Sequence, residues 1–124
     1  MWKDYFINAE VFGADIDTNV LFQEDRIKTF KVDQLNAASI KKMWKNIKKT
    51  NFDLIIDDSL HSYNSSLNFF LHSFERLKKD GLYIVEGVDY KYINKLRNSL
   101  KKFNHEVSMF KNNLSKKIIL QIII

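Results

Sequence analysis

The spacing of hydrophobic residues changes several times along this chain, and each spacing predicts a different element. Between Asn36 and Lys48, apolar positions recur every three or four residues, which predicts an amphipathic helix with Asn36 as its N-cap. The apolar stripe of this helix consists of Ile40, Met43, Trp44 and Ile47. The same spacing predicts helices from Asn64 or Ser65 to Lys79 and from Tyr90 to Phe103, and the last turns of a helix from Met1 to Ile7.

Short runs with strand character separate these helices. Phe52 to Ile56 and Leu82 to Val85 are continuously apolar, as expected for strands that are covered on both faces. Arg26 to Val32 alternates between two sets of side chains, which predicts a strand towards a sheet edge, and Ala9 to Ile16 is a short strand that finishes on Asp15. The helix–strand boundary after Lys79 is marked by Gly81, which is expected to supply the positive φ of a helix C-cap.

Strands and helices alternate in this order, which is typical of an α/β fold with a mostly parallel sheet between helical layers. The last two strands, Glu106 to Phe110 and Lys117 to Ile124, are joined by a short turn-rich linker and should therefore pair antiparallel. A length of 124 residues predicts one domain. The expected fold is a three-layer, Rossmann-like α/β sheet that is mostly parallel and ends in an antiparallel strand pair.

Composition and charge narrow the function classes. The net charge is +5, but the lysines lie at helix ends and on polar helix faces without interleaved arginine or aromatic residues, so nucleic-acid binding is not favoured. The chain has no cysteine, which excludes a disulfide framework and a thiolate metal site and fits a reducing cytoplasm. No signal peptide is apparent, and the apolar tail IILQIII is too short to span a membrane. We expect a cytoplasmic protein that does not bind membranes.

Acidic residues and a histidine follow the two continuously apolar strands. Asp57 and Asp58 come directly after the first, His61 follows three residues later, and Glu86 comes directly after the second. Neighbouring parallel strands would bring these residues to the carboxyl edge of one sheet, where ligands bind in open α/β folds. Asp58 and Glu86 suit Mg²⁺, and His61 suits a general base, because its unperturbed pKa is near neutrality. Structural roles are the alternative: His61 could be a loop residue whose imidazole is bonded to Asp58, and Asp57 could cap the following segment.

A second set of polar residues follows the two N-terminal strands. Asp15, or Asp17 in its place, could hold the two hydroxyls of a ribose from the end of the first strand. Asp33 follows the next strand and could face an adenine amino group, although turn chemistry explains it equally well. We expect His72 and His105 to be structural or exposed.

Four segments together resemble a known family. EVFGADID, RIKTFKVDQ, FDLIIDDSLH and LKKDGLYIVEGV, in this order and spacing, resemble class I S-adenosylmethionine-dependent methyltransferases. The group they resemble most is the macrocin O-methyltransferase-like sugar methylases, with the related cephalosporin hydroxylase-like proteins. The resemblance implies O-methylation of a sugar or a similar small-molecule hydroxyl, with S-adenosylmethionine as cofactor and Mg²⁺ as metal.

The resemblance also assigns roles to individual residues. Asp15, with Asp17 beside it, would bind the cofactor ribose, and Asp33 and Gln34 would lie by the adenine. Asp58 and Glu86 would bind Mg²⁺, and His61, assisted by Asp58, would deprotonate the acceptor hydroxyl. Asp57 would contribute to the cofactor side of the same crevice.

Three features depart from the family pattern. Gly87 stands where the family has a further acidic residue, and Ser59-Leu60 stand where it usually has Gly-Ser. No GxGxG motif occurs, and the family's first strand and glycine-rich cofactor loop are not found before the Ala9 strand. The missing first strand is central in the family's strand order, 3-2-1-4-5-7-6. We therefore expect residues 1–124 to be a partial methyltransferase domain, truncated at its N-terminus.

This expectation leaves several alternatives open. The Ala9 and Phe52 strands could pair directly, or the gap could be filled by a longer native chain, a complementing N-terminal polypeptide or a second copy in a homo-oligomer. The chain could also be a non-catalytic remnant, half of a split enzyme, or another Mg²⁺-binding α/β module.

Overall fold

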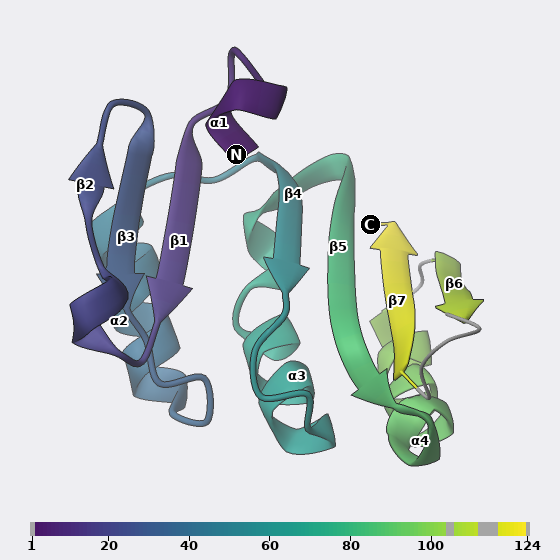
Figure 1. Cartoon of the computed structure of the whole chain (residues 1–124). Coiled ribbons are helices and arrows are strands. Elements are labelled where there is room, and N and C mark those ends of the chain that lie inside the picture. Colours follow the sequence, from purple (N-terminus) through teal and green to yellow (C-terminus); the bar gives the residue numbers. More distant parts are fainter. Residues whose placement is uncertain (1, 104–105, 112–116, 124) are drawn as a thin grey trace.

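The strands form two separate sheets in the computed structural model, which describes residues 2–103, 106–111 and 117–123 (Figure 1). The first sheet consists, in spatial order, of β1 (Val11–Asp15), β3 (Ile27–Lys31) and β2 (Gln23–Glu24). The second consists of β4 (Phe52–Asp57), β5 (Leu77–Asp89), β7 (Lys117–Ile123) and β6 (Glu106–Lys111). The β1–β3 and β4–β5 pairs are parallel, and β7 pairs antiparallel with both β5 and β6. The predicted α/β fold and its antiparallel C-terminal pair are confirmed.

Among the residues that the structure describes, four α-helices accompany these strands, one of a single turn and three of two to three turns. The helices are α1 (Trp2–Tyr5), α2 (Ala37–Ile47), α3 (Tyr63–Leu71) and α4 (Tyr90–Leu100), with 3₁₀ turns η1 (Thr18–Val20), η2 (Phe74–Arg76) and η3 (Lys101–Phe103). The predicted N-cap of α2 is confirmed, because the Asn36 side chain accepts hydrogen bonds from the Ala38 and Ser39 amides. No helix in the described ranges is long and apolar enough to cross a membrane.

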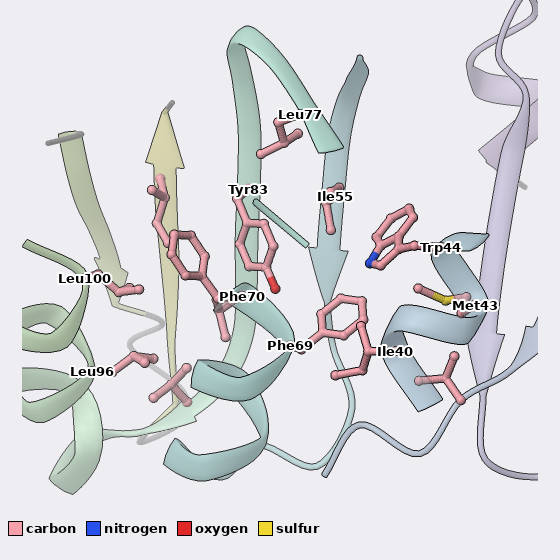
Figure 2. Close-up of a cluster of buried hydrophobic side chains, with 14 of the residues drawn as sticks. Ile40, Met43, Trp44, Ile55, Phe69, Phe70, Leu77, Tyr83, Leu96 and Leu100 are labelled. Carbon is pink, nitrogen blue, oxygen red and sulfur yellow. The ribbon is translucent and has the colours of Figure 1, made fainter. Parts of the chain in front are cut away.

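The core lies between the strands and α2, α3 and α4, which gather on one side of the sheets (Figure 1). Phe70 of α3 packs edge-on against the ring of Tyr83 in β5, with 5.1 Å between centroids, and both side chains are buried (Figure 2). Further buried side chains around them are Ile40, Met43, Trp44, Ile55, Phe69, Leu77, Val85, Leu96 and Leu100. The face of β5 that carries Tyr83 is therefore fully covered by helices.

The opposite face of the second sheet is apolar but less covered. Leu54 and Ile56 in β4, and Leu82 and Ile84 in β5, alternate with buried residues and so point away from the helices. All four are only partly buried, whereas Ile55 and Tyr83 are buried. The second helical layer of a three-layer fold is not among the described elements.

The strands β1 and β4 run side by side in the same direction without pairing (Figure 1). Within the described ranges, β1 pairs only with β3, and β4 pairs only with β5. Phe12 and Phe52 reach across the gap and touch edge to face, with 5.5 Å between ring centroids. Direct pairing of these two strands, one of the alternatives left open by the sequence, is not observed.

The predicted helix to Lys79 is wrong at both ends. Ser62 caps α3 by accepting a hydrogen bond from the Ser65 amide, so the helix begins at Tyr63. The helix ends at Leu71. The Leu71 side chain is exposed, and Phe69 is buried. Ser73 then accepts a hydrogen bond from the Trp44 indole at 3.0 Å, and Leu77 pairs with Phe52 as part of β5. Contacts with distant residues thus override a helical spacing that continues in the sequence.

The predicted C-cap and the predicted end of the next strand are also wrong. Positive φ occurs at Asp80 (61°) rather than at Gly81, and both lie inside β5. A Cβ on Gly81 would stand 2.8 Å from the Lys78 carbonyl oxygen, so close backbone approach explains this glycine. Instead of stopping before Glu86, β5 continues to Asp89 through a bulge between Val85 and Val88.

Candidate active site

The two aspartates at the end of β4 face different environments. Asp57 is the last strand residue and points inwards, with 4% of its surface exposed, because it shares the helix-covered face with Ile55. Asp58 lies just beyond the strand and is exposed. Adjacent carboxylates are therefore available for different roles, one structural and one facing solvent.

The buried Asp57 carboxylate joins a polar network that connects the two sheets. Its Oδ1 accepts a hydrogen bond from Gln34 Nε2 at 2.5 Å and lies 3.2 Å from the Ser59 hydroxyl, which also bonds Gln34 Oε1. Gln34 is itself buried, and its backbone carbonyl accepts a hydrogen bond from Asn68 in α3 at 2.8 Å. Since Gln34 follows β3, this network ties the end of the first sheet to the end of the second.

Burial raises the pKa of Asp57 above its ordinary value of 3.8, because the ionised carboxylate is poorly solvated in the interior. Hydrogen bonds from Gln34, Ser66 and Ser59, and the nearby His61, lower this pKa and partly oppose the effect of burial. Oδ2 makes no hydrogen bond of ordinary geometry within the described part of the chain. Gln34 is thus a main stabiliser of the ionised form.

His61 connects the loop after β4 to the bulge of β5. Its Nδ1 lies 3.2 Å from the Glu86 carbonyl oxygen, and because a carbonyl can only accept, Nδ1 carries the proton of this hydrogen bond. Its Nε2 lies 3.9 Å from Asp58 Oδ1, and one third of the side chain is exposed. The residue adopts a left-handed backbone conformation, with φ of 51°.

The structure brings Asp58, His61 and the backbone of Glu86 together at the carboxyl ends of β4 and β5. Glu86 is partly buried. Among the described residues, no three His, Cys, Asp or Glu side chains converge as a metal site. Asp58, just beyond β4, and Glu86, at the bulge of β5, still offer two carboxylates, and Mg²⁺ takes few protein carboxylates and retains water.

The residues predicted to bind a cofactor lie mainly in turns. Asp15 ends β1, and its Oδ1 accepts a hydrogen bond from the Asp17 amide at 2.8 Å. Asp17 caps η1 by accepting from the Asn19 amide at 2.9 Å, and Asp33 accepts from the Leu35 amide at 3.0 Å. These local turn hydrogen bonds use one oxygen of each carboxylate. Asp15 and Asp17 are exposed, and Asp33 is partly buried.

Some site features were missed by sequence reasoning. Nothing in the spacing of Gln34 and Asp57 signals their hydrogen bond, because it joins residues on two sheets. In the sequence Gly87 stands out only as a missing acidic residue, whereas in the structure it lies against the His61 ring. His72, just after α3, donates a hydrogen bond from Nδ1 to the Asn68 carbonyl at 2.8 Å, as expected for a structural histidine, while His105 lies outside the described residues.

Comparison with known proteins places this arrangement in context. No protein-family model matches the chain. The 8-demethyl-8-alpha-L-rhamnosyl tetracenomycin-C 2'-O-methyltransferase of Streptomyces olivaceus is 35% identical over 92 residues, which are 74% of this chain and 24% of that protein. The mycinamicin VI 2''-O-methyltransferase of Micromonospora griseorubida is 30% identical over 88 residues, 71% of this chain and 22% of that protein. The chain is a homologue of sugar O-methyltransferases.

This homologue of sugar O-methyltransferases also has the fold of class I methyltransferases. It matches the MycE methyltransferase of the mycinamycin pathway, solved in complex with Mg, SAH and mycinamycin VI, with a TM-score of 0.72 and 20% identity. The match covers 98% of this chain and 38% of MycE. A ribosomal RNA methyltransferase from Plasmodium falciparum matches with a TM-score of 0.68 and 19% identity, over 92% of this chain and 71% of that one. These likenesses establish the fold, which serves different substrates.

The chain spans about a quarter of the length of the curated relatives it matches. The resemblance inferred from the four sequence segments is nevertheless confirmed, since the relatives include a demethylmacrocin O-methyltransferase of Streptomyces fradiae at 29% identity over 88 residues.

Proposed function

We propose that this chain forms part of an S-adenosylmethionine-dependent O-methyltransferase that acts on a sugar hydroxyl of a small molecule. The observation that carries the proposal is the match to enzymes named for methylating glycosylated natural products, at 35% and 30% identity. The site supports it independently, because His61 lies beside Asp58 and the Glu86 backbone at the carboxyl edge of the sheet, where α/β folds bind ligands. The lack of cysteine suits a cytoplasmic location.

His61 is proposed as the general base. A sugar hydroxyl is weakly acidic, so methylation is faster when its proton is removed as the new bond forms. The hydrogen bond from Nδ1 to the Glu86 carbonyl leaves Nε2 with the lone pair that accepts this proton. Asp58, 3.9 Å from Nε2, stabilises the imidazolium that results.

Atoms and charges balance in this step. The acceptor oxygen passes its proton to His61 Nε2 and forms a bond to the methyl carbon, and the carbon–sulfur bond breaks with its electron pair left on sulfur. S-adenosylmethionine supplies the electrophilic methyl group when bound. The chain's own contribution is to orient the acceptor hydroxyl beside His61 at the carboxyl end of β4.

Asp58 and Glu86 are the residues proposed to hold Mg²⁺, which would lower the pKa of a coordinated hydroxyl. On the cofactor side, Asp15 is proposed to hold the ribose, with Asp17 as the alternative, and Asp33 to lie near the adenine. Asp15 and Asp17 are exposed at the end of β1 and accessible to a ligand. Gln34 and Asp57 are proposed to support this pocket from the interior, because both are buried and bonded to each other.

We also propose that residues 1–124 are a partial domain. The unpaired edges of β1 and β4 and the partly covered face formed by Leu54, Ile56, Leu82 and Ile84 support this proposal. Parallel sheets are normally covered on both faces, and unpaired central strands are unfavourable. The missing strand and its glycine-rich loop would come from an N-terminal segment, either on the same polypeptide or as a complementing one.

Hydrogen exchange tests the partial-domain proposal. Val11 N bonds the Arg26 carbonyl and Asp15 O bonds the Val32 amide, so alternate residues of β1 face β3. Phe12 and Ala14 therefore direct their amides towards the gap, and we expect these two amides to exchange rapidly in the 124-residue chain. Strong protection of both would contradict the proposal. Calorimetric titration should likewise give weak or undetectable binding of S-adenosylmethionine, and micromolar affinity would also contradict it.

Methyl transfer tests the function itself. A protein that contains this chain together with a glycine-rich loop segment is given S-adenosylmethionine labelled in its methyl group and 8-demethyl-8-alpha-L-rhamnosyl tetracenomycin-C as acceptor. We expect label in the sugar, and a decrease of about 10²–10⁴-fold for His61→Ala, the usual contribution of a general base. His72→Ala is the matched control and should keep the wild-type rate, because the His72 side chain forms a hydrogen bond to the Asn68 carbonyl in α3 and lies outside the proposed site. Equal rates for wild type and His61→Ala would remove His61 from the mechanism.

A further inference from the structure

Gly87 lies against the imidazole of His61 at the bulge of β5. Its backbone has a φ of 68°, a conformation that residues with a side chain rarely adopt. A Cβ built on this residue would stand 2.1 Å from His61 Nδ1 and 2.4 Å from Cε1, far inside any real contact distance. The imidazole therefore occupies the volume that a side chain at position 87 would need.

The backbone beside Gly87 also fixes how the ring is turned. The Glu86 carbonyl accepts the hydrogen bond from Nδ1 at 3.2 Å, and Nε2 is then directed to the side of Asp58. His61 meets the bulge from a left-handed backbone conformation of its own, with φ of 51°. Two unusual backbone positions, 26 residues apart in the sequence, thus meet at one contact.

We propose that Gly87 is a positioning residue that seats the His61 imidazole and selects its Nδ1–H tautomer. The contact is a property of the fold, while its catalytic meaning rests on the proposed function. It follows that a side chain at position 87, including the acidic one expected from the family pattern, is incompatible with His61 in this seat. Gly87 and the His61 position therefore depend on each other.

The tautomer of His61 tests the proposal without any activity measurement. In chain labelled with ¹⁵N, the two ring nitrogens report by NMR which of them carries the proton, at a pH high enough for the ring to be neutral. We expect an excess of the Nδ1–H form in the wild type and nuclear Overhauser contacts between the ring and the Gly87 Hα atoms. Gly87→Ala should reverse the ratio in favour of Nε2–H, because the ring leaves the Glu86 carbonyl.

Gly13→Ala is the matched control. Gly13 lies in β1, in the other sheet, and a Cβ built on it would stand 3.1 Å from Thr29 Cγ2. The substitution therefore also crowds its surroundings but does not touch His61, so the tautomer ratio should stay at its wild-type value. Gly87→Asn separates crowding from backbone strain, since asparagine tolerates positive φ but carries a Cβ. Crowding predicts the same reversal as in Gly87→Ala.

Three results would overturn the role of Gly87 in positioning His61. A wild-type tautomer ratio in Gly87→Asn would overturn the proposal by leaving backbone strain as the only role of Gly87. An excess of Nε2–H in the wild type, or no contact between the ring and Gly87, would overturn it even if both variants failed to fold. Because none of these results depends on methyl transfer, failure of the proposed function and failure of this proposal are distinguishable.

Discussion

The hydrogen bond between Gln34 and Asp57 should stabilise the fold more at neutral pH than in acid. Methionine has nearly the volume and shape of glutamine, so Gln34→Met removes the donor from the Asp57 carboxylate while leaving the packing largely intact. Hydrogen bonds to charged groups contribute about 1.5–3 kcal/mol, and those between neutral groups about 1 kcal/mol. We therefore expect the free energy of unfolding to fall by about 2–3 kcal/mol at pH 7.

The sign of the pH dependence follows from the raised pKa of Asp57. Because this pKa lies above the unfolded value of 3.8, the folded state holds the proton more tightly, and ionising the buried carboxyl destabilises the fold as pH rises. Gln34 lowers this pKa, so removing it raises the pKa further, and each added unit is about 1.4 kcal/mol at pH 7. As the pH falls towards the unfolded value of 3.8, the folded carboxyl increasingly holds its proton in both proteins, and the loss should shrink towards about 1 kcal/mol.

Urea denaturation of wild type and variant at intervals from pH 7 to pH 4 measures both quantities. Gln23→Met is the matched control, because Gln23 is exposed and donates only to the neutral Thr29 carbonyl, at 3.1 Å. Its effect should be within about 0.5 kcal/mol and independent of pH. A loss in Gln34→Met that is the same at pH 7 and pH 4, or no larger than in the control, would refute the reasoning.

Three further substitutions test packing and capping. Tyr83→Phe should raise the free energy of unfolding by about 1 kcal/mol in a thermal melt, because the buried hydroxyl has no hydrogen-bond partner among the described residues; a lower melting temperature would argue against this. Asn36→Ala should lower it by about 1 kcal/mol through loss of the α2 N-cap, whereas Asn46→Ala, on the exposed side of the same helix, should not. Ser73→Ala should lower it by about 2 kcal/mol, because the Trp44 indole N–H loses its buried acceptor; an unchanged urea midpoint would contradict that role.

Sequence reasoning succeeded where local spacing and tertiary contacts agree. The helix α2 was predicted with its N-cap because Asn36 and the apolar stripe specify the same boundaries. It failed for α3, where Leu77 continues the helical spacing but is taken into β5 by pairing with Phe52, 25 residues earlier. Such a non-local pairing has no signal within the segment itself, so the longer helix was the reasonable but incorrect prediction.

The same distinction applies to the site. Strand ends and acidic residues placed Asp58, His61 and Glu86 at one sheet edge, and the structure brings His61 to both neighbours. The sequence could not distinguish Asp57 from Asp58, because their environments depend on strand orientation and on Gln34, which lies 23 residues away. Nor could it reveal the seat at Gly87, which requires two positive-φ residues from different elements to meet.

Asp57 and Gln34 also explain how two unpaired sheets keep a common edge. The strands β1 and β4 share no backbone hydrogen bonds in the described part of the chain, so side chains must hold the sheets in register. Phe12 and Phe52 touch across the gap, and the Gln34–Asp57 hydrogen bond joins the sheets at their carboxyl ends. Gln34 follows β3, which pairs with the strand of Asp15, and Asp57 precedes the loop of His61. A buried carboxylate can therefore help to set the distance between the two sheets that carry the proposed cofactor and acceptor residues.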